Sequence, residues 1–110
     1  MQFVVYGRDG ADAEALNRRM AAREAHLAGC ATLKENGHLI YAVALVDDSD
    51  KMIGSMMVME FATRNELDEW LKQEPYVKGK VWDKIEITAG KVSALFAKQA
   101  ASQSREQVIH

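Results

Sequence analysis

Two apolar segments that follow each other closely place the strongest limit on the fold. Residues 38–46, HLIYAVALV, and residues 52–61, MIGSMMVMEF, are strand-like, and only the charged loop DDSDK separates them. This pattern predicts a β-hairpin. A strand with one solvated face alternates apolar and polar residues, whereas these two segments carry apolar residues on both faces. We therefore expect both faces of this part of the sheet to be covered.

The chain before and after this hairpin supplies two more strands and a long helix. Residues 3–7, FVVYG, and residues 81–88, VWDKIEIT, have the β-branched and aromatic composition of strands. Ahead of the hairpin, the pattern predicts a helix that is capped by Asp12, runs to about Asn36 and stops at Gly37.

A shorter second helix is expected between the hairpin and the last strand. Thr63 lies three residues before Glu66, which is the spacing of a capping box at a helix start. Pro75, the single proline of the chain, is expected to stop this helix. The apolar residues of its inner face are Leu67, Trp70 and Leu71.

The predicted order β-α-β-β-α-β is that of a ferredoxin-like α+β subunit with an antiparallel sheet. The length of 110 residues fits one domain, which we place at residues 1–96, followed by a loosely packed or disordered tail at residues 97–110. Two helices cover only one face of a four-stranded sheet. Since the other face is also apolar, we predict a homodimer through that sheet face.

Composition limits the partners and the compartment. A net charge of −2 gives no basic surface for nucleic acid or an anionic membrane, so neither is an expected partner. The single cysteine, Cys30, excludes an internal disulfide and fits a reducing compartment. The apolar run at residues 3–6 is too short for a signal peptide. These features favour a cytoplasmic protein.

The long helix carries an apolar stripe next to a row of reactive side chains. The stripe consists of Leu16, Met20, Leu27 and Ala31, and the row consists of Arg19, Arg23, His26 and Cys30 at spacings i, i+4, i+7 and i+11. Arg23 projects near the centre of the stripe, where a guanidinium needs a carboxylate partner or an anionic ligand. His26 lies at its margin, where an imidazole can exchange protons.

Simpler roles exist for each of these residues. Arginine often extends from a helix edge to water, and a histidine at a helix margin is often structural. Cys30 lies one turn from His26, so a thiol–imidazole pair is possible, although a small buried cysteine also acts as an apolar residue. Three or four ligands at recognisable spacing define a metal site, and the histidines and Cys30 lack such spacing, so no metal or cofactor is expected.

The segment EPY, residues 74–76, is the second candidate for a site. Pro75 fixes the backbone, Tyr76 offers a hydroxyl on a rigid ring, and Glu74 offers a carboxylate that can pair with a histidine or an arginine. In a ferredoxin-like subunit both helices lie on one side of the sheet, so this segment can approach the edge of the first helix that carries Arg23 and His26. We expect Glu74 to contact His26.

The order of these motifs resembles the YciI-like family. Three stretches carry the resemblance: AAREAHLAGC, LKENGHLIYA and GSMMVMEFATRNELDEWLKQEPYVKGKVWDKIEI. The resemblance extends from about residue 1 to residue 96. Family members carry an Arg-x-x-His-Leu element on the first helix and Asp-Pro-Tyr after the second. By this resemblance His26 and Arg23 take the histidine and arginine positions. Glu74, Pro75 and Tyr76 take those of Asp-Pro-Tyr, with Glu in place of Asp.

The resemblance implies a dimeric α/β barrel with a histidine–acid pair in a cleft, and lactone-type chemistry in some relatives. A serine that often precedes the histidine by five residues is Ala21 here. The leading hypothesis is a small enzyme with His26 as general acid and base, and with Glu74 as its partner. Arg23 would anchor an anionic organic molecule, and Tyr76 and Pro75 would contact it. A non-catalytic ligand-binding or interaction module, and more weakly an oxygen-using monooxygenase, remain alternatives.

Overall fold

The computed structural model describes residues 1–96, so the predicted tail at residues 97–110 lies outside the described part. One antiparallel sheet has the strand order β2-β3-β1-β4. Its strands are β1 (Gln2–Asp9), β2 (Leu39–Val46), β3 (Met52–Glu60) and β4 (Trp82–Gly90). The first and third strands of the sequence therefore pair at the centre, as in a ferredoxin-like sheet.

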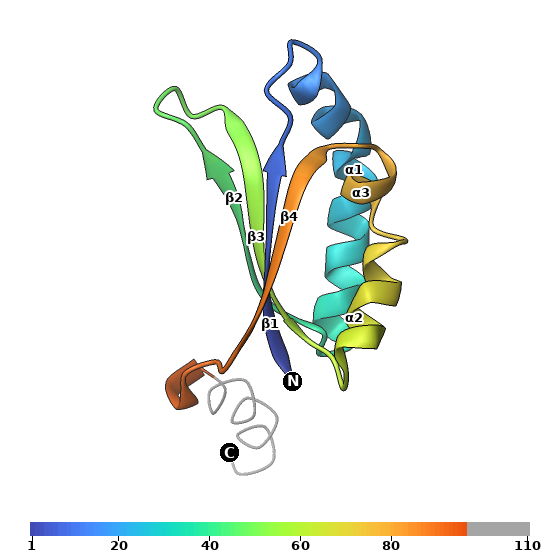
Figure 1. Cartoon of the computed structure of the whole chain (residues 1–110), viewed down its shortest axis with the longest axis vertical. Coiled ribbons are helices and arrows are strands. Elements are labelled where there is room, and N and C mark those ends of the chain that lie inside the picture. Colours follow the sequence, from blue (N-terminus) through green and yellow to red (C-terminus); the bar gives the residue numbers. More distant parts are fainter. Residues whose placement is uncertain (97–110) are drawn as a thin grey trace.

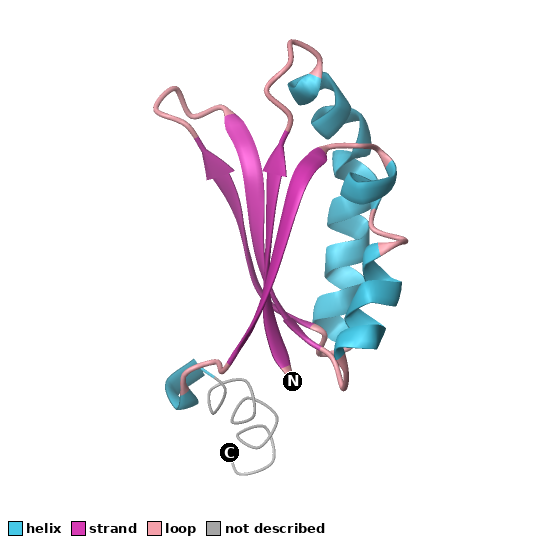
Figure 2. Cartoon of the chain, viewed as in Figure 1, coloured by secondary structure: helices cyan, strands magenta, loops and turns pink. Residues whose placement is uncertain are grey.

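Three helices lie on one side of this sheet in the described part: α1 (Ala15–Glu35), α2 (Arg64–Leu71) and the short α3 (Pro75–Lys78). Figure 1 shows them together to the right of the sheet, with α1 running along its length, and Figure 2 separates the helix layer from the strand layer by colour. The predicted ferredoxin-like α+β fold is confirmed, with α3 as an additional element between α2 and β4.

The core lies between the helix layer and the sheet. It is built from alternate residues of the two central strands and from α2, α3 and the start of β4. Its members are Phe3, Val5, Met57, Met59, Phe61, Leu67, Tyr76, Val81 and Trp82. Burying such side chains stabilises a fold by about 1.5–3 kcal/mol each, so this layer fixes how the helices sit on the sheet.

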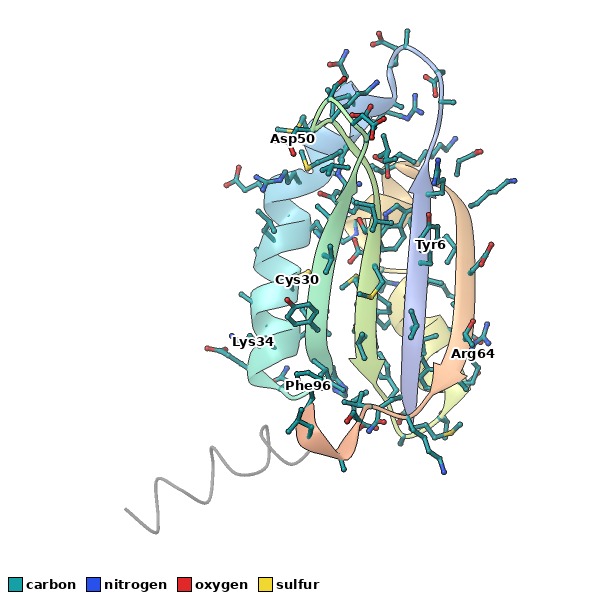
Figure 3. The ribbon with its side chains drawn as sticks, turned by 90° about the vertical axis from the view of Figure 1, so that its left-hand side faces the viewer. Tyr6, Cys30, Lys34, Asp50, Arg64 and Phe96 are labelled. Carbon is teal, nitrogen blue, oxygen red and sulfur yellow. The ribbon has the colours of Figure 1, made fainter. Side chains whose placement is uncertain are left out.

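The opposite sheet face, which we call the outer face, is also apolar at its centre. The strand registers place Val4 beside Val58 and Tyr6 beside Met56, and they continue to Tyr41 and Val43 on β2. Figure 3 looks onto this face, where no helix of residues 1–96 covers the centre of the strands, and labels Tyr6 on β1. Tyr41 is 65% exposed in the single chain. The predicted two-sided apolar character of β2 and β3 is therefore present.

The predicted inner face of α1 is wrong. Met20 and Leu27 are 51% and 47% exposed, whereas Ala15, Arg19 and His26 are buried. The true inner face is turned by roughly a quarter of a turn from the apolar stripe, at 100° per residue. The reason is that the sheet and α3 present polar partners to α1, so polar side chains are buried there.

The ends of the helices differ partly from expectation. Asp12 is not the cap of α1: Glu14 is the residue before the helix, and Asp12 instead accepts the Glu14 N–H and pairs with Arg18. Gly37, with φ of 82°, ends the α1 region as predicted. Pro75 does not directly end α2, which stops at Leu71, but begins α3, because proline is tolerated at the first helical position.

Candidate functional site

A buried histidine–carboxylate pair joins α1 to the start of α3. His26 Nδ1 lies 2.9 Å from Glu74 Oε1, and the two residues are 7% and 3% exposed. The same Oε1 atom accepts the backbone N–H of Tyr76 at 2.8 Å, because Glu74 is the cap of α3. A carboxylate held by the backbone in this way fixes the imidazole in one orientation. The expected contact between the EPY segment and His26 is present.

The ring of Tyr76 connects this pair to a buried arginine. It stacks on His26 with ring centres 3.9 Å apart and an interplanar angle of 12°. The guanidinium carbon of Arg19 lies 4.7 Å from the centre of the same ring. Burial raises the pKa of the Tyr76 phenol, and the positive charges of Arg19 and Arg23 oppose this rise. The phenol is therefore a hydrogen-bond donor at neutral pH.

Arg19 is held by two residues of the sheet, Asp9 and Ser55. Its Nη1 donates to Asp9 Oδ1 and Oδ2 at 2.8 and 3.0 Å, and its Nη2 donates to Ser55 Oγ at 2.8 Å. Trp82 Nε1–H also donates to Ser55 Oγ, at 3.2 Å. Among the described residues the buried Arg19 Nε has no hydrogen-bond partner. The guanidinium is thus rigidly placed, with one donor unused.

Asp9 shows the cost of burying this ion pair. Burial raises the pKa of its carboxyl above the usual value, although the Arg19 charge and hydrogen bond act in the opposite direction. Breaking a buried pair by removing one partner leaves an uncompensated charge. The Asp9–Arg19 pair therefore couples the end of β1 tightly to α1.

Cys30 completes the row along α1, one turn beyond His26. Its Sγ atom lies 3.5 Å from His26 Nε2, on the side of the ring away from Glu74. Burial, and then the charge of Glu74, raise the pKa of the Cys30 thiol to about 11. Figure 3 shows Cys30 on α1, beside the edge strand β2.

A cavity of about 180 Å³ opens between α1 and the β2–β3 hairpin. Its polar walls come from five side chains: Arg19, Arg23, His26, Ser55 and Tyr76. Cys30 and the apolar residues Leu27, Ala42, Val43, Ala44, Met52 and Met57 form the rest. A larger hollow of about 360 Å³ at the N-terminus contains none of the predicted site residues, so the hairpin cavity is the candidate site.

The structure separates the predicted site residues into two groups. His26, Tyr76 and Arg23 line the cavity, and Glu74 lies directly behind His26. Pro75 is not part of the lining and serves to begin α3. Arg23 was expected to reach a carboxylate or an anionic ligand; its side chain is exposed and makes no ion pair among the described residues. Its role as an anion anchor stays a prediction.

Sequence reasoning missed the network around Arg19. Asp9, Ser55 and Trp82 lie at the end of β1, within β3 and at the start of β4, and only the sheet register brings them together. The available signal was Arg19 itself, since it belongs to the same helical row as His26. Within residues 1–96, no group of three or more His, Cys, Asp or Glu side chains is placed so that it could hold a metal ion. No helix in the described part is long and apolar enough to cross a bilayer.

The fold and the site together define a class: a small ferredoxin-like α+β protein with a histidine–carboxylate pair beside a cavity between helix and sheet. The chain belongs to the YCII-related family, whose model matches residues 1–91. The resemblance seen in the motifs is therefore confirmed.

Two relatives agree with this family assignment, and one solved structure has the same fold. The YciI proteins of Escherichia coli O6:H1 and Shigella flexneri are each 31% identical over 93 residues, which covers 79% of this chain and 93% of theirs. The solved structure is 5-chloro-2-hydroxyhydroquinone dehydrochlorinase from Burkholderia phenoliruptrix AC1100, in complex with 2,5-dihydroxybenzoquinone. It matches with a TM-score of 0.73 and 23% identity, over 83% of this chain and 94% of that one, which shows a common fold.

Proposed function

We propose that this protein is a small cytosolic enzyme that transfers a proton next to a carbonyl group of a small anionic organic molecule, with isomerisation or elimination as the outcome. The observation that carries this proposal is the buried His26–Glu74 pair beside a cavity that arginine side chains line. A paired imidazole is the side chain best suited to proton exchange at neutral pH.

The chemistry of each wall supports this assignment. With Glu74 accepting from Nδ1–H, Nε2, which lies 3.5 Å from Cys30 Sγ, is the nitrogen that can exchange a proton with a ligand. Arg23 is free to meet an anionic group, and Tyr76 can donate its hydroxyl to the carbonyl oxygen, since both line the cavity. A donor placed where negative charge develops lowers the barrier to forming an enolate.

The small residues of β2 support the expected size of the ligand. Ala42 and Ala44 face the helix side, opposite Met57 and Ser55 on β3, and both line the cavity. Larger side chains there would fill the space of about 180 Å³. The structural neighbour is a dehydrochlorinase bound to a small dihydroxyquinone, which supports an organic acid or quinone of similar size as a ligand class.

The test uses 2,5-dihydroxybenzoquinone, whose ring hydrogens lie next to carbonyl groups. Their exchange for deuterium in D₂O is followed by proton NMR, with and without protein. We expect the protein to accelerate exchange, and the accelerated part to fall about 100-fold in His26→Gln, because a general base contributes about 10²–10⁴-fold. Asn65→Gln, a substitution at an exposed position of α2, is the matched control. It should accelerate the exchange of the quinone hydrogens as much as the unchanged protein does.

The same experiment separates the enzyme from the alternative of a non-catalytic binding module. A module would bind the quinone, as seen by shifts in the NMR signals of His26, and would leave the exchange rate at that of the protein-free solution. That outcome would overturn the proposed activity, whereas acceleration that depends on His26 would exclude the module.

A further inference from the structure

Glu74, His26 and Cys30 are joined by two consecutive contacts, and His26 and Cys30 line the cavity. Glu74 Oε1, His26 Nδ1, His26 Nε2 and Cys30 Sγ are joined by contacts of 2.9 Å and 3.5 Å at the two ring nitrogens. The acid–base proposal uses the first contact and leaves the second unexplained. Cys30 lines the cavity together with His26, so a ligand in the cavity would lie beside both residues.

The direction of the two hydrogen bonds follows from Glu74. An ionised carboxylate only accepts, and its Oε1 already accepts the Tyr76 N–H, so the neutral imidazole carries its proton on Nδ1. Nε2 then has a lone pair that can accept the S–H of Cys30. A carboxylate, an imidazole and a nucleophile in this order are the arrangement by which a histidine activates a hydroxyl or a thiol.

We propose that Cys30 is a nucleophile, which adds through Sγ to a small α,β-unsaturated carbonyl compound that also carries an anionic group. This inference rests on the His26–Glu74 pair of the proposed function, but it assigns a covalent step to a residue outside that pair. A thiol is soft and polarisable, and therefore suits a conjugated carbon better than a hard acyl centre.

The charge of the cavity wall is an independent reason to expect such a ligand. Arg19 lines the same cavity, is 2% exposed and keeps a buried Nε–H without a partner among the described residues. Arg23 lies one helical turn further along and also lines the cavity. Arg19 is already paired with Asp9, whereas Arg23 makes no ion pair among the described residues, so Arg23 is the group that favours a ligand with an anionic part.

The proposed step balances without an oxidant or a reductant. The S–H proton of Cys30 passes to His26 Nε2 as the bond from Sγ to the β-carbon forms. The electron pair of the carbon–carbon double bond moves toward the carbonyl, which gives an enolate. His26 then returns the proton to the α-carbon, and the product is a thioether adduct. The reverse sequence, with loss of the α-proton to Nε2, releases the unsaturated compound.

The test uses N-ethylmaleimide, an α,β-unsaturated dicarbonyl, and intact-protein mass spectrometry. Cys30 is the only cysteine of the chain, so each adduct reports on this sulfur. We expect His26→Gln to slow adduct formation at pH 7 by about tenfold or more, because the thiol loses its base. Glu74→Gln should give a smaller loss, and Cys30→Ser should give no adduct.

Misfolding cannot imitate the expected result. Unfolding exposes the thiol and would raise the labelling rate, whereas the proposal requires that rate to fall in His26→Gln. Labelling in denaturant gives the reference rate, which must be the same for all variants that contain Cys30. Equal rates in the folded protein and in folded His26→Gln would overturn the proposal, as would a sulfur that does not react at all in the folded state.

A second probe tests the anionic part. A maleimide that carries a carboxylate should label the folded protein faster than N-ethylmaleimide does, and Arg23→Gln should remove this preference. Absence of the preference would overturn the anionic assignment. The quinone exchange experiment is scored separately: His26-dependent exchange with His26-independent labelling refutes only the role of Cys30, and the reverse result refutes only the proposed proton transfer.

Discussion

Arg19 and Arg23 are one helical turn apart and have opposite environments. Arg19 is buried against Asp9 and Ser55, and Arg23 is exposed at the mouth of the cavity. Position along the helix therefore does not decide whether a guanidinium is buried or exposed. The decisive factor is whether the sheet below presents a carboxylate, as the end of β1 does for Arg19.

Arg19→Met is expected to lower the free energy of unfolding by about 3–5 kcal/mol, because it leaves the buried Asp9 without its partner. Arg23→Met removes an exposed charge and should cost under about 1 kcal/mol. Urea denaturation of the two variants measures both values. Similar losses in the two proteins would contradict the different burial of the two arginines.

Glu74→Gln is expected to shift the tautomer of neutral His26 away from Nδ1–H, because an amide no longer requires a donor. The ¹⁵N chemical shifts of labelled histidines report this change. His38 is an internal control, since its Nδ1 lies 2.8 Å from the carbonyl oxygen of Glu60 and is not near Glu74 in sequence. A His26 tautomer that is unaffected by the substitution would show that Glu74 does not orient the ring.

The Cys30 thiol predicts a pH dependence of stability. Its pKa is raised from 9.0 to about 11 in the folded protein, so folding favours the protonated thiol. This contribution is fully present below about pH 9 and is lost as the pH rises toward about 11. Comparing denaturation of the unchanged protein and Cys30→Ala isolates it, because the lysines and tyrosines titrate in both. Parallel stability curves across this range would contradict the raised pKa.

Residue identity allowed part of the site to be predicted. His26, Glu74 and Tyr76 are found together because a titratable row on one helix and a rigid EPY segment can meet only on the helix side of the sheet. Asp9 and Ser55 could not be assigned in this way. Their contact with Arg19 depends on the antiparallel register of β1 and β3, which the sequence pattern does not reveal.

At the scale of elements, the strands were easier to predict than the orientation of α1. The order of elements followed from turn and capping signals such as Thr63, whose hydroxyl accepts the Glu66 N–H as a capping box requires. The rotation of α1 was wrong because hydrophobicity alone cannot show that buried Arg19 and His26 have partners. Because α1 lies over a polar site, the face that it buries carries Arg19 and His26, and its apolar stripe is left largely exposed.

The packing of Trp82 against β1 depends on a glycine. A Cβ atom on Gly7 would lie 2.4 Å from the ring of Trp82, which shows that the indole packs directly on the backbone of β1. Gly7→Ala is expected to displace Trp82, break its bond to Ser55 and cost about 1–3 kcal/mol, as overpacking does. Thermal denaturation and the Trp fluorescence spectrum measure this change.

Gly90→Ala is the matched control for this substitution. Gly90 ends β4, and a Cβ atom placed there meets nothing within 4 Å. It should therefore leave both stability and fluorescence nearly unchanged. Equal behaviour of the two alanine variants would mean that the indole does not need the space above Gly7.

At the scale of the whole molecule, the outer face of the sheet is the apolar surface that no described helix covers. Val4, Tyr6, Met56 and Val58 lie next to one another at its centre, and charged residues such as Lys84 and Glu86 on β4 lie toward one edge. An apolar centre bordered by charge is typical of an interface. We propose that a second copy of the chain covers this face, since a self-complementary sheet needs no other partner.

Tyr41→Glu tests this dimer without disturbing the core, because Tyr41 lies on the outer face and is exposed in the single chain. A stable interface of this kind buries at least about 1,200–2,000 Å², and a carboxylate within it has no means of recovering its hydration. Sedimentation velocity at micromolar concentration should show a dimer for the unchanged protein and a shift toward monomer for Tyr41→Glu. Asn65→Glu, which adds the same charge to exposed α2, should stay dimeric. A monomeric unchanged protein, or a Tyr41→Glu dimer of undiminished stability, would refute pairing through the outer face.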